Sequence, residues 1–151
     1  MNGSDRRLET LVGGGAFFEC PRWHEGRLWV SDYWCYQVLA IAPEGTTETV
    51  AQVPGAPSGL GWLPDGTLLV VSMLDTKLLR VENGSTVVHA DLSAHSGPQS
   101  NDMVIDAAGR AMSARSTSRP SPTWRPPTWS GWTRTGRCRW PPTACCSRTG
   151  R

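Results

Sequence analysis

The sequence predicts an all-β fold: part of a β-propeller, about two and a half blades long, followed by an irregular and disordered C-terminal tail. Residues 27–32 follow a glycine turn and alternate between two faces, which is typical of a short strand. The same pattern of a glycine turn followed by a strand returns at residues 64–70 and, in part, at residues 106–110. A period of roughly 40–45 residues with four short strands per unit is typical of propeller blades.

The first blade accounts for the chain up to residue 52. We expect its four strands at residues 16–23, 27–32, 37–41 and 47–52, with Glu44-Gly45 as one of the turns between them. A further strand is expected before the blade, at residues 8–12. The glycines at 13–15 then form a flexible turn that leads into the first blade.

The second blade has the same pattern, with strands expected at residues 59–62, 67–72, 77–82 and 85–90. Asp65-Gly66 and Asn83-Gly84 are expected hairpin turns, because glycine takes a positive φ without penalty and asparagine tolerates it. Residues 91–99 form a polar connector. Residues 102–105 begin a third blade, and residues 107–109 should turn into its second strand.

The pattern breaks after residue 110, so we divide the chain into propeller blades at 1–110 and a tail at 111–151. The first part holds seven Lys and Arg against thirteen Asp and Glu, whereas the tail holds eight Arg and no acid. The tail contains no Leu, Ile, Val, Phe or Tyr, but four of the eight Trp and three of the five Cys. Such a composition cannot build a core and indicates disorder.

Two explanations of the tail remain open. One is a translational frameshift, because Arg, Pro, Trp and Cys without Leu, Val or Asp are typical of a GC-rich gene read out of frame. Permitted codons, shifted by one base, can restore strand and turn residues there. The other is a genuine Pro/Arg-rich disordered tail. Arginine among tryptophans also resembles a nucleic-acid-binding composition, but the wrong frame explains it more simply, so we expect no nucleic-acid partner.

Other classes of protein are disfavoured by the same sequence. Nothing approaches the ~18 consecutive apolar residues of a membrane span, and residues 1–10 lack the apolar core of a signal peptide. Five cysteines are an odd number for a disulfide framework. We therefore expect a cytoplasmic protein with no membrane partner.

Four short motifs in blade order carry a resemblance to a known family. They are Glu19-x-Pro21-x-Trp23, Gly26-x-Leu28-x-x-x-Asp32, Pro57-Ser58-Gly59-Leu60-Gly61-Trp62, and Asn101-Asp102-Met103-Val104-Ile105-Asp106 with Gly109-Arg110. Over about residues 8–110 the chain resembles the senescence marker protein / gluconolactonase / luciferin-regenerating enzyme family. The resemblance implies a six-bladed propeller that hydrolyses a sugar lactone or related lactone with a divalent metal such as Ca, Mn, Mg or Zn.

Glu19 is the residue that the resemblance identifies as a metal ligand at the central channel. A hard divalent ion prefers oxygen ligands, and a carboxylate near the channel axis adds charge. The structural alternative is an exposed acid on a loop. The resemblance places two more ligands, an Asn and an Asp, in later blades, so the chain as written holds one ligand of three and an incomplete metal site.

Asn101, Asp102 and Gln99 are the predicted substrate-binding residues. The family uses an Asn-Asp pair here with the asparagine facing the site, and an asparagine side chain can bind a ligand hydroxyl or a water. The alternative is an Asx turn ahead of a strand. Gln99 stands where related proteins with sugar-acid activity often carry an arginine, which leaves the substrate in doubt.

The resemblance implies a lactone as the small-molecule partner, although we expect this short chain to be inactive. A closed six-bladed ring needs on the order of 240–270 residues, against 151 here. Two alternatives stay open: a non-enzymatic binding module that uses the propeller face, and a fragment without a function of its own. Open sheet edges also predict self-association.

Overall fold

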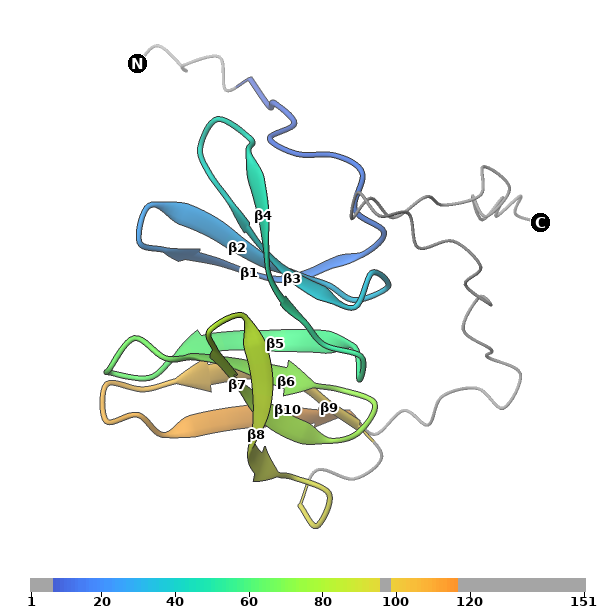
Figure 1. Ribbon diagram of the computed structural model, residues 1–151, viewed down its shortest axis with the longest axis vertical. Coiled ribbons are helices and arrows are strands. Elements are labelled where there is room, and N and C mark those ends of the chain that lie inside the picture. The colour runs from blue at the N-terminus through green and yellow to red at the C-terminus, as the bar shows by residue number, and fades with distance from the viewer. Residues whose placement is uncertain (1–6, 96–98, 117–151) are drawn as a thin grey trace, which may run out of the picture. The chain divides into compact units, whose positions relative to one another are not determined.

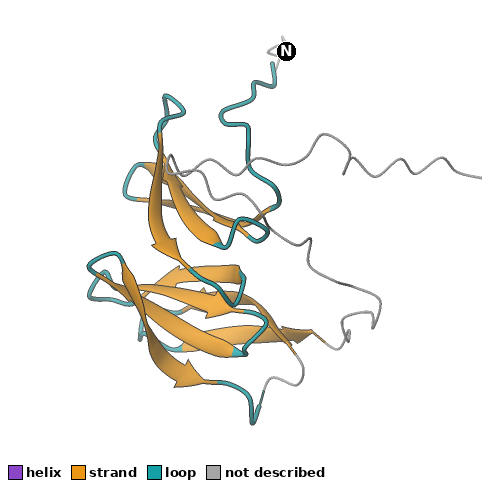
Figure 2. Cartoon of the chain, turned by 45° about the vertical axis from the view of Figure 1, so that its right-hand side comes forward, coloured by secondary structure: helices purple, strands orange, loops and turns teal. Residues whose placement is uncertain are grey.

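The computed structural model describes residues 7–95 and 99–116, and within these ranges the chain contains strands and turns but no helix. Three antiparallel sheets follow one another along the sequence (Figures 1 and 2). Consequently, the described residues hold no helix that is long and apolar enough to cross a membrane. The all-β fold class predicted from the sequence is confirmed.

Each sheet is a run of consecutive strands. The first is β1 (Phe18–His24), β2 (Arg27–Asp32), β3 (Gln37–Ile41) and β4 (Thr47–Gln52); the second is β5 (Pro57–Trp62), β6 (Leu68–Ser72), β7 (Lys77–Glu82) and β8 (Ser85–Asp91); the third is β9 (Gln99–Ile105) and β10 (Ala111–Ser116). Strands β2, β3, β4 and β7 have the predicted bounds. Strand β9 begins three residues earlier than predicted, at the end of the expected connector.

Two expectations need correction. The strand predicted at residues 8–12 is absent, and no partner strand for this segment exists within 7–95 and 99–116. A strand needs a neighbour to pair its backbone groups; instead, Val12 packs against Val30 of the first sheet. The tail predicted from residue 111 begins with β10, so regular structure extends to Ser116. Residues 117–151, on which the tail expectations fall, lie outside the described residues.

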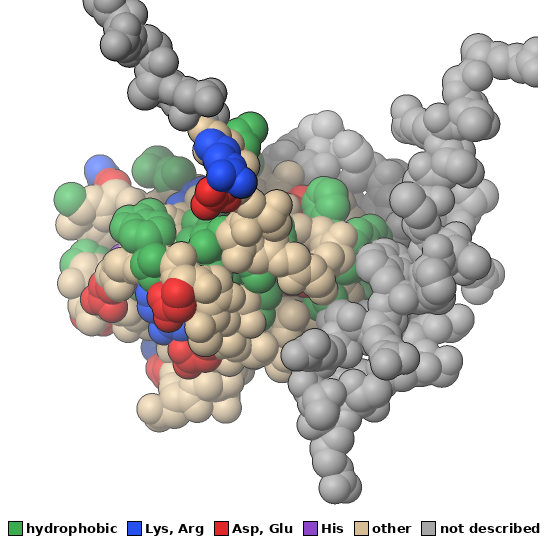
Figure 3. All heavy atoms as spheres, turned by 90° about the horizontal axis from the view of Figure 1, so that it is seen from above, with side chains coloured by type: hydrophobic (Ala, Val, Ile, Leu, Met, Phe, Trp, Pro, Cys, Tyr) green, Lys and Arg blue, Asp and Glu red, His purple; other side chains and the backbone are tan. Residues whose placement is uncertain are grey.

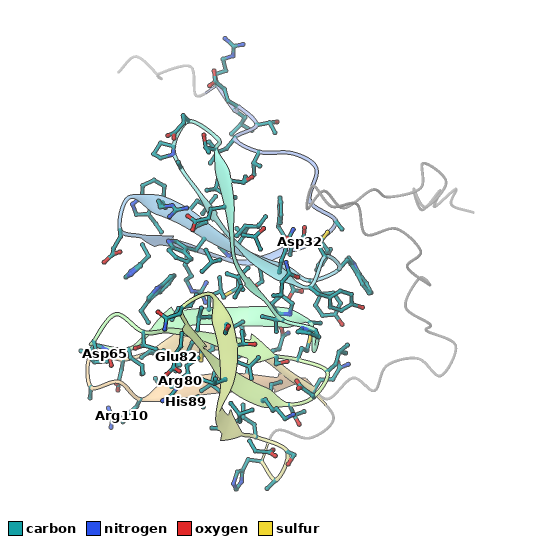
Figure 4. The ribbon with its side chains drawn as sticks, viewed as in Figure 1. Asp32, Asp65, Arg80, Glu82, His89 and Arg110 are labelled. Atoms are coloured by element: carbon teal, nitrogen blue, oxygen red, sulfur yellow. The ribbon has the colours of Figure 1, made fainter. Side chains whose placement is uncertain are left out.

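The turns follow the predicted chemistry. Asn83 and Gly84, between β7 and β8, both have a positive φ, of 51° and 76°. Asp65 accepts a hydrogen bond from the Thr67 amide, and Asp106 accepts two in the turn from β9 to β10, from Ala108 and Arg110. In Figure 4 the label Asp65 marks the turn between β5 and β6, and the label Arg110 marks the turn between β9 and β10. The turns after β5 and after β9 are therefore stabilised in the same way, by an aspartate that accepts backbone hydrogen bonds.

The sheets stack face to face, and apolar side chains fill the spaces between them. Between the first and second sheets lie Val38 and Val53 with Leu60, Leu68, Val70 and Leu79. Between the second and third sheets lie Leu69, Val71 and Leu78 with Met103. Alternate residues of β6 thus serve opposite interfaces, as the strand period of two requires. We call the face of a sheet that meets the next sheet in sequence its front face, and the opposite face its back face.

An aromatic cluster strengthens the first of these interfaces. The His24 ring stacks on Trp62 with ring centroids 3.9 Å apart, and Trp29 meets Trp62 edge-on at 5.2 Å. The Trp29 indole N–H donates to the carbonyl of His24 at 3.1 Å. Offset and edge-to-face aromatic pairs each contribute about 0.5–1.5 kcal/mol beyond the area that they bury. His24 is therefore a packing residue at the interface between the first and second sheets.

A buried carboxylate fixes the entry to β1. Asp32, at the end of β2, is fully buried and accepts hydrogen bonds from the backbone N–H groups of Ala16 and Phe17 at 3.1–3.3 Å (Figure 4). A buried carboxylate needs such donors, because an unpaired charge in the interior is costly. Asp32 thereby ties the segment just before β1 to the first sheet.

Strand β5 lies close to β9 because two of its residues lack side chains. A Cβ built on Gly59 would lie 2.6 Å from the Met103 backbone nitrogen, and one built on Gly61 would lie 2.9 Å from the Ile105 side chain. Glycine in a strand often marks such a close backbone approach. The third sheet therefore depends on Gly59 and Gly61 for its position against the second.

Substitution of Gly59 by alanine should separate β5 from β9, since the clash at Gly59 is with backbone that cannot rotate away. We expect a loss of about 1–3 kcal/mol in the free energy of unfolding, the usual cost of overpacking, measured by urea denaturation. Gly13→Ala is the matched control, because a Cβ there meets nothing within 4 Å. Equal stability of the two variants would contradict the close approach.

Candidate functional site

An irregularity in β1 presents Glu19. The pairing of β1 with β2 shifts register between Glu19 and Arg22, and Cys20 within the shift has a φ of 50°. Pro21 follows and has no N–H to place in the ladder. Such a β-bulge re-aims side chains and is common next to functional sites. It sets Glu19 and Cys20, neighbours in sequence, against the same adjoining sheet.

Ser58 joins the two predicted site residues Glu19 and Asn101. Its Oγ lies 3.0 Å from Glu19 Oε2 and 2.8 Å from Asn101 Oδ1. The three residues come from β1, β5 and β9, the first strand of each sheet, and are up to 82 positions apart in sequence. The fold therefore gathers a carboxylate, a hydroxyl and an amide at one place.

Ser58 is buried and its backbone is hydrogen-bonded to the first sheet. Ser58 is 1% exposed, and its backbone carbonyl accepts a 2.7 Å hydrogen bond from the Ser31 hydroxyl of β2. A hydroxyl carries one hydrogen, so Ser58 donates to either Glu19 or Asn101 at a given moment. A ligand that hydrogen-bonds to one of these two groups would consequently leave the Ser58 hydroxyl free to donate to the other.

Asp102 has hydrogen-bond partners other than the Glu19–Ser58–Asn101 group. Its Oδ1 accepts hydrogen bonds from Arg22 at 2.9 Å, from the Cys20 thiol at 3.2 Å and from the Met103 N–H at 2.7 Å. Burial opposes ionisation, but the Met103 and Cys20 hydrogen bonds and the Arg22 charge together lower the pKa of Asp102. These bonds make Asp102 a link between β1 and β9.

The Cys20 thiol connects three strands. Its sulfur accepts a hydrogen bond from the Leu60 N–H of β5 at 3.0 Å and donates to Asp102 of β9. Burial raises the pKa of Cys20 from 9.0 to about 11; the Leu60 hydrogen bond counters this rise and the Asp102 contact adds to it. The thiol is therefore protonated at neutral pH and acts as a structural group.

Gln99 lies at the start of β9, two residues before Asn101, and the register of β9 with β10 shifts between Ser100 and Met103. It is buried, as is its neighbour Ser100, whose hydroxyl is one of two buried side-chain oxygens without a hydrogen-bond partner among the described residues. A buried amide can hold a ligand by hydrogen bonds but supplies no charge. Gln99 is thus a buried neutral residue close to Asn101 in sequence, without the cation that the resemblance led us to look for.

Tyr33, which follows β2, lies near Glu19. Burial, together with Tyr36 and the charge of Glu19, raises the pKa of the Tyr33 phenol. Its ring meets Phe17 edge-on at 6.4 Å and Trp34 at 4.7 Å. Aromatic rings of Phe17, Tyr33 and Trp34 thus gather at this end of the first sheet.

A divalent cation would lack ligands here. Glu19 supplies one carboxylate, and Ser58 and Asn101 supply neutral oxygens, whereas Ca²⁺ takes six to eight oxygen ligands and Mg²⁺ six. Among residues 7–95 and 99–116, no three His, Cys, Asp or Glu side chains converge on a point that could hold a metal. The described residues do not by themselves fit the divalent ion that the resemblance implies.

Sequence reasoning selected Glu19 and Asn101 and missed Ser58. A signal was present, because Ser58 stands eight residues before Gly66, as Asn101 stands eight before Gly109. Comparison of the blades position by position would have found it. Asp102 was selected as a neighbour of Asn101, but its carboxylate hydrogen-bonds to Cys20, Arg22 and Met103 and not to Ser58.

A comparison with protein families and a comparison with solved structures agree. The family model described as SMP-30/Gluconolactonase/LRE-like region matches residues 17–123, which extends past residue 110, where the resemblance was expected to stop. A gluconolactonase from Xanthomonas campestris is similar at a TM-score of 0.62 and 21% identity, over 72% of this chain and 38% of that one. A comparison with curated sequences found no match.

Two further solved structures are similar. A regucalcin from Agrobacterium tumefaciens, described as a calcium-binding protein, has a TM-score of 0.53 and 22% identity over 65% of this chain and 38% of that one. Virginiamycin B lyase from Staphylococcus aureus has a TM-score of 0.50 and 13% identity over 68% of this chain and 42% of that one. At these identities the likeness shows the fold alone. The chain spans about two fifths of the length of these proteins.

Removal of the Ser58 hydroxyl should loosen the site with a small effect on the fold. For Ser58→Ala we expect a loss of about 0.5–1.5 kcal/mol in the free energy of unfolding, the net value of one hydrogen bond. We also expect the side-chain amide resonances of Asn101 to shift in NMR spectra. Ser85→Ala, at an exposed position that begins β8, should change neither. An unchanged Asn101 signal would contradict the bridge.

The raised pKa of Cys20 predicts slow alkylation. With a pKa of about 11 instead of 9.0, the folded chain holds roughly 100-fold less Cys20 thiolate at pH 8, and the thiolate is the reactive form. Mass spectrometry of the Cys20 peptide should show a rate in buffer that climbs with pH up to about 11. In urea the rate should level off near pH 9.

The raised pKa of Cys20 also makes the stability of the fold depend on pH. The unfolded chain loses the Cys20 proton first, so the free energy of unfolding should fall as the pH rises from about 9 to about 11. Cys20→Ser should reduce this fall. Equal alkylation profiles in buffer and in urea would contradict the burial of the thiol.

Proposed function

The chain belongs to the SMP-30/gluconolactonase/LRE-like family, and from this premise we propose that it carries the first part of a site for binding and hydrolysing a sugar lactone. The observation that carries the proposal is the hydrogen-bonded group of Glu19, Ser58 and Asn101. Strands from three successive sheets contribute it, in the way that functional groups of a propeller gather near the central channel.

The three side chains match the chemistry of a lactone of a sugar acid. Such a molecule offers hydroxyl groups that donate hydrogen bonds and a ring carbonyl that accepts them. The Glu19 carboxylate can accept from a hydroxyl or from a water, and the Asn101 amide can donate to an oxygen. The rings near Glu19, Phe17 and Tyr33 among them, supply an apolar wall.

Hydrolysis needs a water that attacks the ring carbonyl carbon. A bond forms between the water oxygen and that carbon, the ring C–O bond breaks, and the ring oxygen leaves as a hydroxyl, so the product is an open hydroxy acid. In this proposal Glu19 and Asn101 orient the substrate, and Ser58 fixes both. Their contribution is positioning, which lowers the entropic part of the barrier.

A divalent cation forms part of the proposed activity at the level of the family, and the calcium-binding regucalcin among the similar structures supports it. When bound, such an ion polarises the carbonyl and activates water. Glu19 is the charged ligand that the described chain offers, and further ligands must come from outside the described residues. We therefore propose that this chain binds the lactone without turning it over at a measurable rate.

Lactone binding can be tested on the full chain. We expect glucono-lactone to give saturable signals in saturation-transfer NMR with the natural chain. Its affinity should fall severalfold or more in Glu19→Gln and in Asn101→Leu, and should be unchanged in Glu44→Gln. Glu44 is an exposed acid in the turn between β3 and β4 and serves as the matched control for charge. Open gluconate, xylose and glycerol distinguish lactone recognition from general polyol binding.

Turnover is tested in the same samples with Ca²⁺, Mn²⁺, Mg²⁺ or Zn²⁺ added, by following acid release above the uncatalysed rate. We expect none. Metal-dependent turnover that Glu19→Gln abolishes would contradict the incomplete site while supporting the reaction. Failure of any lactone to bind, or equal binding by Glu19→Gln and Glu44→Gln, would contradict the proposed function itself.

A further inference from the structure

A buried serine of the first sheet adjoins the Glu19–Ser58–Asn101 group without belonging to it. Ser31, in β2, is fully buried, and its Oγ donates a 2.7 Å hydrogen bond to the backbone carbonyl of Ser58. In the pairing of β1 with β2, Ser31 is also the Cα partner of Glu19. Ser31 is therefore linked to the group in two ways, by a side-chain bond to one strand and by ladder pairing with another.

The second sheet shows that a blade can be packed without a hydroxyl at this place. Ser31 pairs with Val38 of β3, and 40 positions later Val71 pairs with Leu78 of β7. Val71 is fully buried among the apolar side chains between the second and third sheets. Ser31 holds the corresponding place on the front face of the first sheet. Because a valine satisfies the packing at this place, the hydroxyl of Ser31 has a role other than packing.

The bond between Ser31 and Ser58 is shielded from water. A buried hydroxyl is unfavourable unless it finds an acceptor, and the acceptor of Ser31 is the Ser58 carbonyl. Figure 3 shows charged side chains among apolar ones at the molecular surface, where water competes for hydrogen bonds. Ser31 and Ser58, in contrast, are 0% and 1% exposed. A hydrogen bond in such surroundings is electrostatically stronger than one in water, so it restrains the backbone of Ser58.

The backbone of Ser58 determines where its hydroxyl lies. Ser58 falls within the register shift of β5 against β6, where the regular ladder is interrupted. Its Oγ is one rotatable bond away from that backbone, yet lies 3.0 Å from Glu19 Oε2 and 2.8 Å from Asn101 Oδ1. A small rotation of the backbone would lengthen one of these contacts. Ser31 thus supplies a restraint at a point where the ladder of the second sheet is irregular.

We propose that Ser31 is a positioning residue of the lactone site: its hydroxyl holds the carbonyl of Ser58 so that the Ser58 Oγ reaches Glu19 and Asn101 together. This role rests on the proposed function and deepens it. Ser31 itself touches no ligand, because it is fully buried. Its effect on lactone binding passes through the hydroxyl of Ser58.

Threonine and valine at position 31 form the matched pair that tests this role. The two side chains have nearly the same shape, but only threonine has a hydroxyl, so crowding by the added carbon atoms affects both. In saturation-transfer NMR of the full chain, Ser31→Val should bind glucono-lactone about two- to tenfold more weakly than Ser31→Thr, the effect of one net hydrogen bond. The side-chain amide resonances of Asn101 should shift in Ser31→Val and keep their natural positions in Ser31→Thr.

A second background separates positioning from a general effect on the fold. Once Ser58→Ala has removed the hydroxyl, Ser31 has nothing left to position, so Ser31→Thr and Ser31→Val should bind the lactone equally in that background. If either variant fails to fold, as judged by circular dichroism, Ser31→Ala is compared with the natural chain instead, because it adds no volume.

Ser72→Ala is the matched control for the loss of a buried hydroxyl. Ser72, in β6, is 1% exposed, and its Oγ has no hydrogen-bond partner in the part of the chain that the structure describes. This variant should bind the lactone like the natural chain.

The outcomes distinguish this role from the proposed function. Equal lactone affinities of Ser31→Thr and Ser31→Val, in a chain that Glu19→Gln weakens, would overturn the role of Ser31 and leave the proposed function standing. A difference that persists in the Ser58→Ala background would overturn the role as well, because the effect would not pass through Ser58. Absence of lactone binding by the natural chain would overturn both. A difference that disappears with the Ser58 hydroxyl would support the role.

Discussion

The constraint on which this structure depends is that a sheet with two apolar faces must be covered twice. The strands of the second sheet show it most clearly, because Leu68 and Val70 point to one neighbour and Leu69 and Val71 to the other. A lone sheet of this composition would expose half of its core to water, at a cost that grows with the apolar area. Stacking therefore determines the position of the site residues as well as the stability.

The stacking explains why the site assembles from distant residues. Glu19, Ser58 and Asn101 each sit near the start of the first strand of a sheet, and the sheets stack through those first strands. Ser58 can bridge its two neighbours because Gly59 lets β9 approach β5 closely. The missing side chain of Gly59 thus allows its neighbour Ser58 to reach Asn101.

Much of this was accessible from the sequence. The period of the turns and the alternation within strands predicted the sheets, and four strands to the residue, because both signals are local. The prediction of a strand at residues 8–12 was wrong, because a strand needs a partner strand and the local sequence pattern does not reveal one. Glu19 and Asn101 were selected by resemblance, whereas Ser58 required knowledge of how three strands align in space.

The cluster around Asp102 shows a second limit. The sequence gives no sign that Arg22 and Cys20, 80 and 82 positions away, both hydrogen-bond to the carboxylate oxygen of Asp102 that also accepts from the Met103 N–H. The β-bulge that turns Cys20 toward β9 is a matter of backbone register, and register depends on the whole sheet. Adjacent residues Asn101 and Asp102 consequently have different surroundings and different roles.

The buried carboxylate of Asp32 has a consequence for how this chain tolerates change. Asp32 holds the amides of Ala16 and Phe17, and Glu19 follows two residues later. A substitution at Asp32 would therefore reach the Glu19 carboxylate through the main chain. We therefore expect the effects of replacing Asp32 and Glu19 not to add, because both residues depend on the same short backbone segment.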